Sequence, residues 1–137
     1  MNIYDRLGVR TLINAVDTYT AIGGSLIPAE VMDAMVEASK YFVSIEELQD
    51  KAGERIARLT RNESACVTSG AAAGLALATA ACVTGENPAL AARLPDTRGM
   101  KNEVIIHRCQ RNGYDHAVRQ IGVQIVEIGF VDGTHPW

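Results

Sequence analysis

Short apolar runs alternate with helical patterns along the second half of this chain, and that alternation limits its fold more than any other feature. Residues 65–68, 103–106 and 124–128 are brief apolar runs of the kind that form buried strands. Between them, residues 71–84 contain strong helix formers and end at a glycine, and residues 111–121 permit another helix. Strands that alternate with helices predict an α/β architecture with a mostly parallel sheet.

The first half of the chain is expected to form an arm followed by two helices. Residues 1–30 show no sustained hydrophobic period, which is typical of an extended segment. Pro28 suits the first turn of a helix, and apolar residues recur at helical spacing from there to Tyr41. Ser44, followed by acidic residues, predicts the start of a second helix over residues 44–60.

Composition and charge argue against several classes of function. Apolar residues make up 47% of the chain and charged residues 21%, which is a globular balance. The net charge is -3 and basic residues are scattered, so we expect no nucleic-acid binding. The longest apolar run, residues 71–83, is shorter than the roughly 20 residues that a membrane helix needs. The charged first residues do not resemble a secretory signal, and we therefore expect a cytoplasmic protein.

The cysteines and histidines do not form the pattern of a metal site. The three cysteines lack CxxC spacing and are odd in number, so we expect buried thiols rather than a disulfide framework. The histidines do not fall four residues apart on one helix. We predict no metal site among these residues, which are Cys66, Cys82, Cys109, His107, His116 and His135.

The junction that follows the first predicted strand is the most informative local motif. Thr68, Ser69 and Gly70 lead directly into a helix that begins near Ala71. Free N–H groups at the start of a helix suit an anion, and a glycine lets the backbone approach it closely. The motif matches neither a Walker loop nor a dinucleotide fingerprint. Phosphate binding and simple tight packing of small residues both remain open at this junction.

A polar string, residues 107–116, follows the second predicted strand. It therefore lies at the carboxyl edge of the sheet, where open α/β sheets bind ligands. Tyr114 is able to stack on a ring there, or to anchor the loop. A solvated loop is the alternative interpretation of the same residues.

Six ordered sequence blocks resemble the selenocysteine-synthase-like family of fold-type-I enzymes, which depend on pyridoxal phosphate (PLP). The blocks are INAVDTYTAIGGSLIPAEVMDAM, FVSIEELQDKAGERIARLT, ACVTSGAAAGLALATAACVTG, MKNEVIIHR, RNGYDHAVRQIG and VEIG. Within that family the chain is similar to seryl-tRNA selenium transferases and, in the opening and middle blocks, more to the D-glucosaminate-6-phosphate ammonia-lyase type. The resemblance implies an aspartate-aminotransferase-like fold, with an amino-terminal arm over residues 1–30 and an incomplete PLP-binding large domain over residues 31–137.

The resemblance also implies roles for two groups of residues. The backbone donors of Ser69, Gly70 and Ala71 would bind the phosphate of PLP. A second group would lie near the face of the cofactor ring, namely Gln110, Asn112 and Tyr114. The resemblance does not identify which of the three stacks on the ring. The chain departs from the family pattern at two places. At Val16-Asp17 the family commonly has a small residue and a glycine, and at Cys109-Gln110 it often has a glycine and a histidine.

No catalytic residue is identified in this sequence. The resemblance places the lysine that holds PLP, the aspartate that pairs with its ring nitrogen, and the small domain after residue 137. The three lysines present fall on two surface helices and at the amino end of a strand, away from the ligand edge; they are Lys40, Lys51 and Lys101.

The expected function is therefore the amino-terminal part of a PLP-dependent lyase or transferase. It would act on a small amino-bearing substrate and assemble as a homo-oligomer. Two alternatives stay open. One is a truncated, non-catalytic remnant or assembly module, and the other is an activity like that of the seryl-tRNA selenium transferases.

Overall fold

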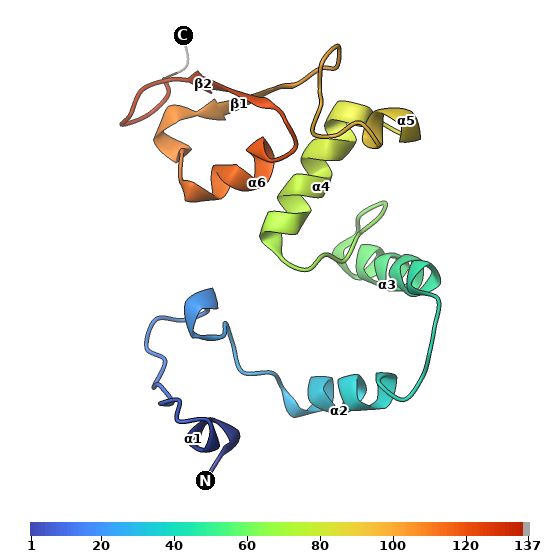
Figure 1. Ribbon diagram of the computed structural model, residues 1–137, viewed down its shortest axis with the longest axis vertical. Coiled ribbons are helices and arrows are strands. Elements are labelled where there is room, and N and C mark those ends of the chain that lie inside the picture. Colours follow the sequence, from blue (N-terminus) through green and yellow to red (C-terminus); the bar gives the residue numbers. More distant parts are fainter. Residues whose placement is uncertain (136–137) are drawn as a thin grey trace. The chain divides into compact units, whose positions relative to one another are not determined.

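The computed structural model describes residues 1–135 and divides the chain into two compact units (Figure 1). The first unit covers Met1–Leu48 and the second begins at Gln49, so the boundary falls inside helix α3 (Ile45–Thr60). Residues 136–137, the end of the predicted large domain, lie outside the described residues. The domain boundary predicted after residue 30 stays a prediction.

The first unit consists of short helical elements without a core of its own. Helix α1 (Ile3–Arg6) is capped by Asn2, and a 3₁₀ turn, η1, covers Thr20–Ile22. Helix α2 (Ala29–Ala38) starts immediately after Pro28, as the sequence predicts. No residue of this unit is buried. Its apolar side chains therefore gain little from folding within the unit alone.

Helix α3 begins where the capping pattern predicts. The Ser44 hydroxyl accepts a hydrogen bond from the Glu47 backbone N–H at 3.3 Å, which satisfies one of the free donors of the first turn. Gly53 and Ala57 form the buried face of the helix. A Cβ atom at Gly53 would clash with the Ala65 carbonyl oxygen. The glycine thus allows the segment after α3 to pass directly against the helix.

The second unit contains a two-stranded parallel sheet. Strand β1 (Glu103–His107) pairs along its whole length with β2 (Gln124–Ile128). Between them the chain forms η2 (Arg108–Gln110), η3 (Gly113–Asp115) and α6 (His116–Arg119). Because parallel strands end at the same edge, the loop after β1 starts at the carboxyl edge of the sheet. The α/β prediction is confirmed, whereas the assignment to fold type I stays a prediction.

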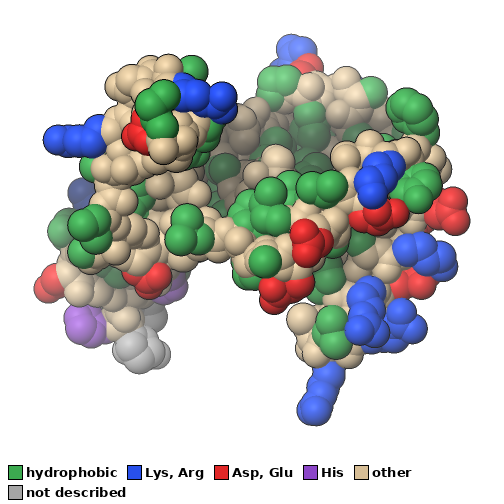
Figure 2. All heavy atoms as spheres, turned by 90° about the horizontal axis from the view of Figure 1, so that it is seen from below, with side chains coloured by type: hydrophobic (Ala, Val, Ile, Leu, Met, Phe, Trp, Pro, Cys, Tyr) green, Lys and Arg blue, Asp and Glu red, His purple; other side chains and the backbone are tan. Residues whose placement is uncertain are grey.

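Helix α4 (Ala71–Thr84) packs against α6 and against the short helix α5 (Pro88–Ala91). Its sequence is apolar on all sides, as in helices that are covered all round. Leu75 and Leu77 nevertheless stay exposed, and Figure 2 shows many hydrophobic side chains at the surface. Neither α4 nor any other helix of residues 1–135 is long and apolar enough to span a membrane.

The amino edge of the sheet is held by the segment that precedes β1. The Thr97 hydroxyl donates a hydrogen bond to the Gly122 carbonyl at 2.7 Å and accepts one from the Asn102 amide at 3.1 Å. Gly122 has a φ of 92°, and a Cβ atom there would clash with the Pro95 carbonyl oxygen. This close approach fixes the segment against the turn that leads into β2.

Three expectations from the sequence need correction. Residues 65–68 form no strand in the described part of the chain, because a strand exists only where a neighbour pairs with its backbone, and β1 and β2 pair with each other. Within residues 111–121 only η3 and the four-residue α6 are helical, since Asn112 and Gly113 favour a turn. The three cysteines are exposed rather than buried: Cys66 lies in the unpaired segment after α3, Cys82 on α4 and Cys109 in η2.

Candidate functional site

The start of helix α4 presents a row of backbone donors. The helix begins at Ala71, and Gly70 before it has φ 145° and ψ 173°, a conformation that only glycine adopts readily. No side chain caps this end. Within residues 1–135, the N–H groups of Ser69, Gly70 and Ala71 donate no hydrogen bond. These three donors are therefore available to an external acceptor.

The surroundings of these donors favour an anion. The dipole of the fourteen-residue α4 places partial positive charge at its amino end. A Cβ atom at Gly70 would meet no atom within 4 Å, so the space beside the backbone is open. The Thr68 hydroxyl donates to the Gly70 carbonyl at 3.0 Å and so holds that acceptor in place. The confirmed helix start agrees with the predicted phosphate-binding motif, although the expected strand before it is absent from the described structure.

The loop after β1 carries the second predicted group of residues. Gln110 ends η2, Asn112 precedes η3 and Tyr114 lies within it. The Asn112 amide accepts a hydrogen bond from the Tyr114 N–H at 2.8 Å and donates one to the Gln110 carbonyl at 3.1 Å. Asn112 thus stabilises its own loop. The Tyr114 side chain is exposed, with 76% of the residue accessible.

Arg111 connects this loop to the sheet. Its guanidinium group donates hydrogen bonds to the Asp115 and Glu127 carboxylates, and Glu127 lies on β2. The Asp115 side chain is only 6% exposed. The hydrogen bond from Arg111 holds the pKa of Asp115 below its ordinary value, and the same bond, with a further contribution from Glu127, raises the pKa of Arg111.

Sequence reasoning did not identify Arg111, Asp115 or Glu127. The opposite charges of Arg111 and Asp115, four residues apart, could have predicted their ion pair from the sequence. Glu127 is sixteen residues from Arg111 and was not predictable from spacing. No hydrogen bond or ion pair of the described residues joins this loop to residues 69–71. The two predicted groups therefore share no direct hydrogen bond, and both lie within the second unit.

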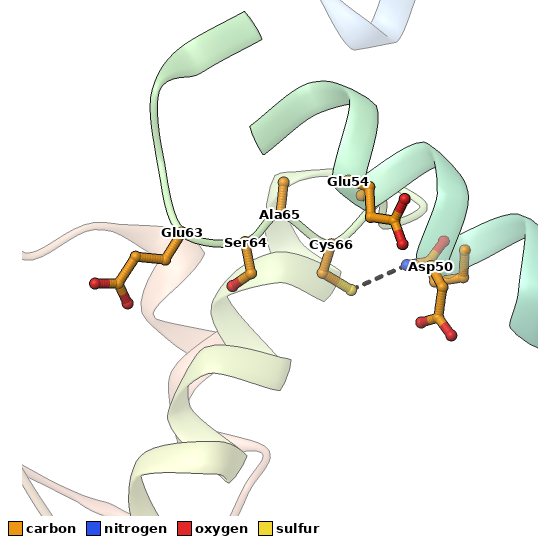
Figure 3. Close-up of a pocket in the computed structure, with 8 residues that line it drawn as sticks. Asp50, Glu54, Glu63, Ser64, Ala65 and Cys66 are labelled. Carbon is orange, nitrogen blue, oxygen red and sulfur yellow. Dashed lines mark hydrogen bonds between the residues drawn. The ribbon is translucent and has the colours of Figure 1, made fainter. Parts of the chain in front are cut away.

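An open cavity of about 360 Å³ lies between α3 and the segment that follows it (Figure 3). Asp50, Glu54 and Glu63 are among its lining residues, and the Gln49 amide donates to the Cys66 sulfur at 3.0 Å. Three carboxylates disfavour an anion through repulsion. This cavity is therefore a poor phosphate site. No group of His, Cys, Asp or Glu in residues 1–135 has the arrangement of a metal site.

The three lysines fall outside both groups of predicted site residues in the sequence. Lys40, in the turn after α2, forms an exposed ion pair with Glu37 at 2.7 Å, and Lys51 forms one with Glu54 at 3.0 Å on the exposed surface of α3. Lys101 precedes β1 at the amino edge of the sheet. Lys101 is therefore at the opposite edge of the sheet from the start of the loop after β1.

Comparison with known proteins identifies enzymes as relatives. The chain is 41% identical to the D-glucosaminate-6-phosphate ammonia lyase of Salmonella typhimurium over 99% of its own length. The homologues of this chain are enzymes, and one is an ammonia lyase. The chain is also 35% identical, over 96% of its length, to a 5'-C-glycyluridine monooxygenase-decarboxylase of a Streptomyces species. No protein-family model matches the chain.

A solved structure agrees with the first of these relatives. The structure of a D-glucosaminate-6-phosphate ammonia-lyase matches 95% of the chain with a TM-score of 0.90 and 40% identity. The chain spans little more than a third of each of these proteins, namely 38% and 34% of the two curated relatives and 36% of the solved chain. The relationship to a lyase is therefore established for this part of the relatives' length.

Proposed function

We propose that this chain forms the cofactor-phosphate-binding part of a PLP-dependent lyase that acts on an amino-bearing substrate. The observation that carries the proposal is the start of α4, where Ser69, Gly70 and Ala71 present unpaired N–H groups at the positive end of a helix. The similarity to an ammonia lyase supports elimination of an amine as the reaction. The substrate named for that relative suggests a phosphorylated amino sugar acid.

The residues at the start of α4 fit the phosphate of PLP. A phosphate dianion needs several convergent donors and the space for its oxygens. The three N–H groups supply the donors, and Ser69 adds a hydroxyl. The open space beside Gly70 and the methyl side chains that follow it leave room for the group. No carboxylate accepts a hydrogen bond from these donors within residues 1–135, so none of the three is already engaged by an anion.

Each residue would then have a limited task. When bound, PLP supplies an electron sink for the carbon next to the substrate amine. Ser69, Gly70 and Ala71 would hold the phosphate and so fix the position of the ring. The exposed Tyr114 side chain and Gln110 are available to cover the ring face and exclude water, since the amide of Asn112 is already engaged in its loop. In this proposal the chain contributes cofactor binding and orientation rather than covalent attachment, which agrees with the pairing of Lys40 and Lys51 to carboxylates.

One further observation favours a second function, a non-catalytic assembly module. The first unit has no buried residue, and the second buries only Ala57, Ala117 and Val123 among its apolar residues in the described part of the chain. Such surfaces normally contact another polypeptide. An assembly module would use them without binding PLP.

Binding experiments distinguish the two functions. The purified protein should bind PLP, and pyridoxal without its phosphate should bind at least about tenfold more weakly, because loss of charge-assisted hydrogen bonds removes about 1.5 kcal/mol or more. Inorganic phosphate should compete with PLP. Equal binding of PLP and pyridoxal would refute the phosphate site, and self-association without any PLP binding would favour the assembly module.

A further inference from the structure

The loop between β1 and α6 is irregular, yet it carries Gln110 and Tyr114, the two side chains that the proposed function assigns to the cofactor ring. Only short 3₁₀ turns interrupt it, and such turns supply few backbone hydrogen bonds. Its orientation relative to the sheet must therefore come from side-chain contacts. Among the described residues, Arg111 makes the contacts that link the middle of this loop to β2.

The chemistry of the Arg111 contacts suits a rigid connection. The guanidinium group is planar and donates in two directions at once, here to Asp115 through Nε and to Glu127 through Nη1. Asp115 is nearly inaccessible and lies at the start of α6, so one end of the bridge is fixed in packed structure. Glu127 belongs to β2, whose position is fixed by pairing with β1. Arg111 therefore joins two elements that are themselves held in place.

The neighbouring arginine does not duplicate this connection. Arg108 Nε lies 3.6 Å from the second oxygen of Glu127, which is beyond hydrogen-bonding distance, and more than half of its side chain is exposed. The pair adds charge attraction without directional geometry. The direction of the loop therefore depends on Arg111.

We propose that Arg111 is a positioning residue, whose bridge from Asp115 to Glu127 fixes the loop so that Tyr114 and Gln110 face the cofactor ring in one orientation. The inference deepens the proposed function and rests on it for the identity of the ring. The fixing of the loop itself rests on the contacts of Arg111 alone. Arg111 Nε and Nη1 donate to the two carboxylates, so the proposed role of Arg111 is to hold the loop and not to contact the ring or the substrate.

The test compares Arg111→Lys and Glu127→Gln with the unaltered protein. Lysine keeps the positive charge but cannot donate in two fixed directions, and glutamine removes the acceptor charge on β2. Arg98→Lys is the matched control, because Arg98 makes a similar forked pair with Asp96 in a different loop, at 2.8 and 2.7 Å. The double variant Arg111→Lys/Glu127→Gln completes a double-mutant cycle.

Two measurements are needed. The first is amide hydrogen exchange without cofactor, in which residues 108–115 should exchange about tenfold faster in either single variant while α3 and α4 are unchanged. The double variant should add little, because both changes remove one connection. The second is the visible circular dichroism of bound PLP, which reports ring orientation. That band should be lost in Arg111→Lys while PLP affinity changes by less than about twofold, since Arg111 donates to Asp115 and Glu127 and not to the residues that would bind the phosphate.

The outcomes separate the inference from the proposed function. Absence of PLP binding by the unaltered protein would refute the proposed function, and hydrogen exchange would then decide the fixing of the loop alone. Unchanged exchange in residues 108–115 of Arg111→Lys would overturn the inference. So would retention of the dichroism band, or faster exchange spread over the whole second unit, since the latter indicates a general structural role. Arg98→Lys should leave both measurements as in the unaltered protein.

Discussion

Replacement of Gly70 by alanine tests the phosphate site through backbone conformation alone. With φ 145° and ψ 173°, Gly70 lies in a region that is essentially restricted to glycine. A Cβ atom there would meet nothing within 4 Å, so steric contact with other residues contributes nothing. The strain amounts to about 1–3 kcal/mol. The chain must either retain this strain or rotate the peptide groups next to Gly70.

Rotation of those peptide groups turns the N–H donors of residues 69–71 away from a common acceptor. Loss of one charge-assisted hydrogen bond costs about 1.5–3 kcal/mol. The affinity of Gly70→Ala for PLP should therefore fall by roughly 10-fold to 150-fold. Titration with PLP, followed by absorbance and repeated with inorganic phosphate as competitor, measures the change. The affinity for phosphate should decrease in parallel, because the ring does not contribute to that interaction.

Gly99→Ala is the matched control for this prediction. Gly99 also has a positive φ, 79°, and a Cβ atom there would also meet nothing within 4 Å. It lies in the turn closed by the hydrogen bond from Met100 N–H to the Thr97 carbonyl, away from α4 in the sequence. Gly99→Ala should lower the free energy of unfolding and leave PLP affinity unchanged. Equal PLP affinity in Gly70→Ala and the unaltered protein, or an equal loss in Gly99→Ala, would refute the reasoning.

Three further predictions concern stability and covalent labelling. Gly53→Ala should lower the free energy of unfolding in urea by about 1–3 kcal/mol, because the new methyl group clashes with the Ala65 carbonyl. Gly74→Ala is the control, because its Cβ makes only an ordinary contact at 3.6 Å, and equal urea midpoints for the two variants would contradict the clash. The pKa of Asp115 is lowered in the folded state, so the stability that its carboxylate contributes is present above the ordinary value of 3.8 and is lost as pH falls below it. In acid titrations followed by circular dichroism, the stability of Asp115→Asn should therefore depend less on pH below 3.8 than that of the unaltered protein, and an unchanged dependence would exclude this role. Borohydride reduction after incubation with PLP should leave no stoichiometric label on any lysine in peptide mass mapping, and one specific label would show that this chain attaches the cofactor itself; the lysines are Lys40, Lys51 and Lys101.

Local chemistry was readable from the sequence where neighbouring residues decide the structure. Ser44 and the acids after it predicted the start of α3, and Pro28 predicted the start of α2. The glycine before a run of small helix formers predicted that α4 begins at Ala71. Helix starts depend on donors and caps within four residues, so no knowledge of the fold is needed to find them.

The tertiary structure decided which residues meet across the chain. A strand was expected at residues 65–68, but strand formation needs a partner that local sequence does not specify, and no partner is present in the described part of the chain. The parallel register of β1 and β2 placed Glu127 within reach of Arg111, sixteen residues earlier. The sequence showed that the loop after β1 is polar, but only the pairing of β1 with β2 shows which contacts hold this loop against the sheet. The sequence thus determined where helices begin, because capping interactions involve residues close together in the chain. The tertiary structure determined how the loop after β1 is connected, because those contacts depend on the pairing of distant backbone segments.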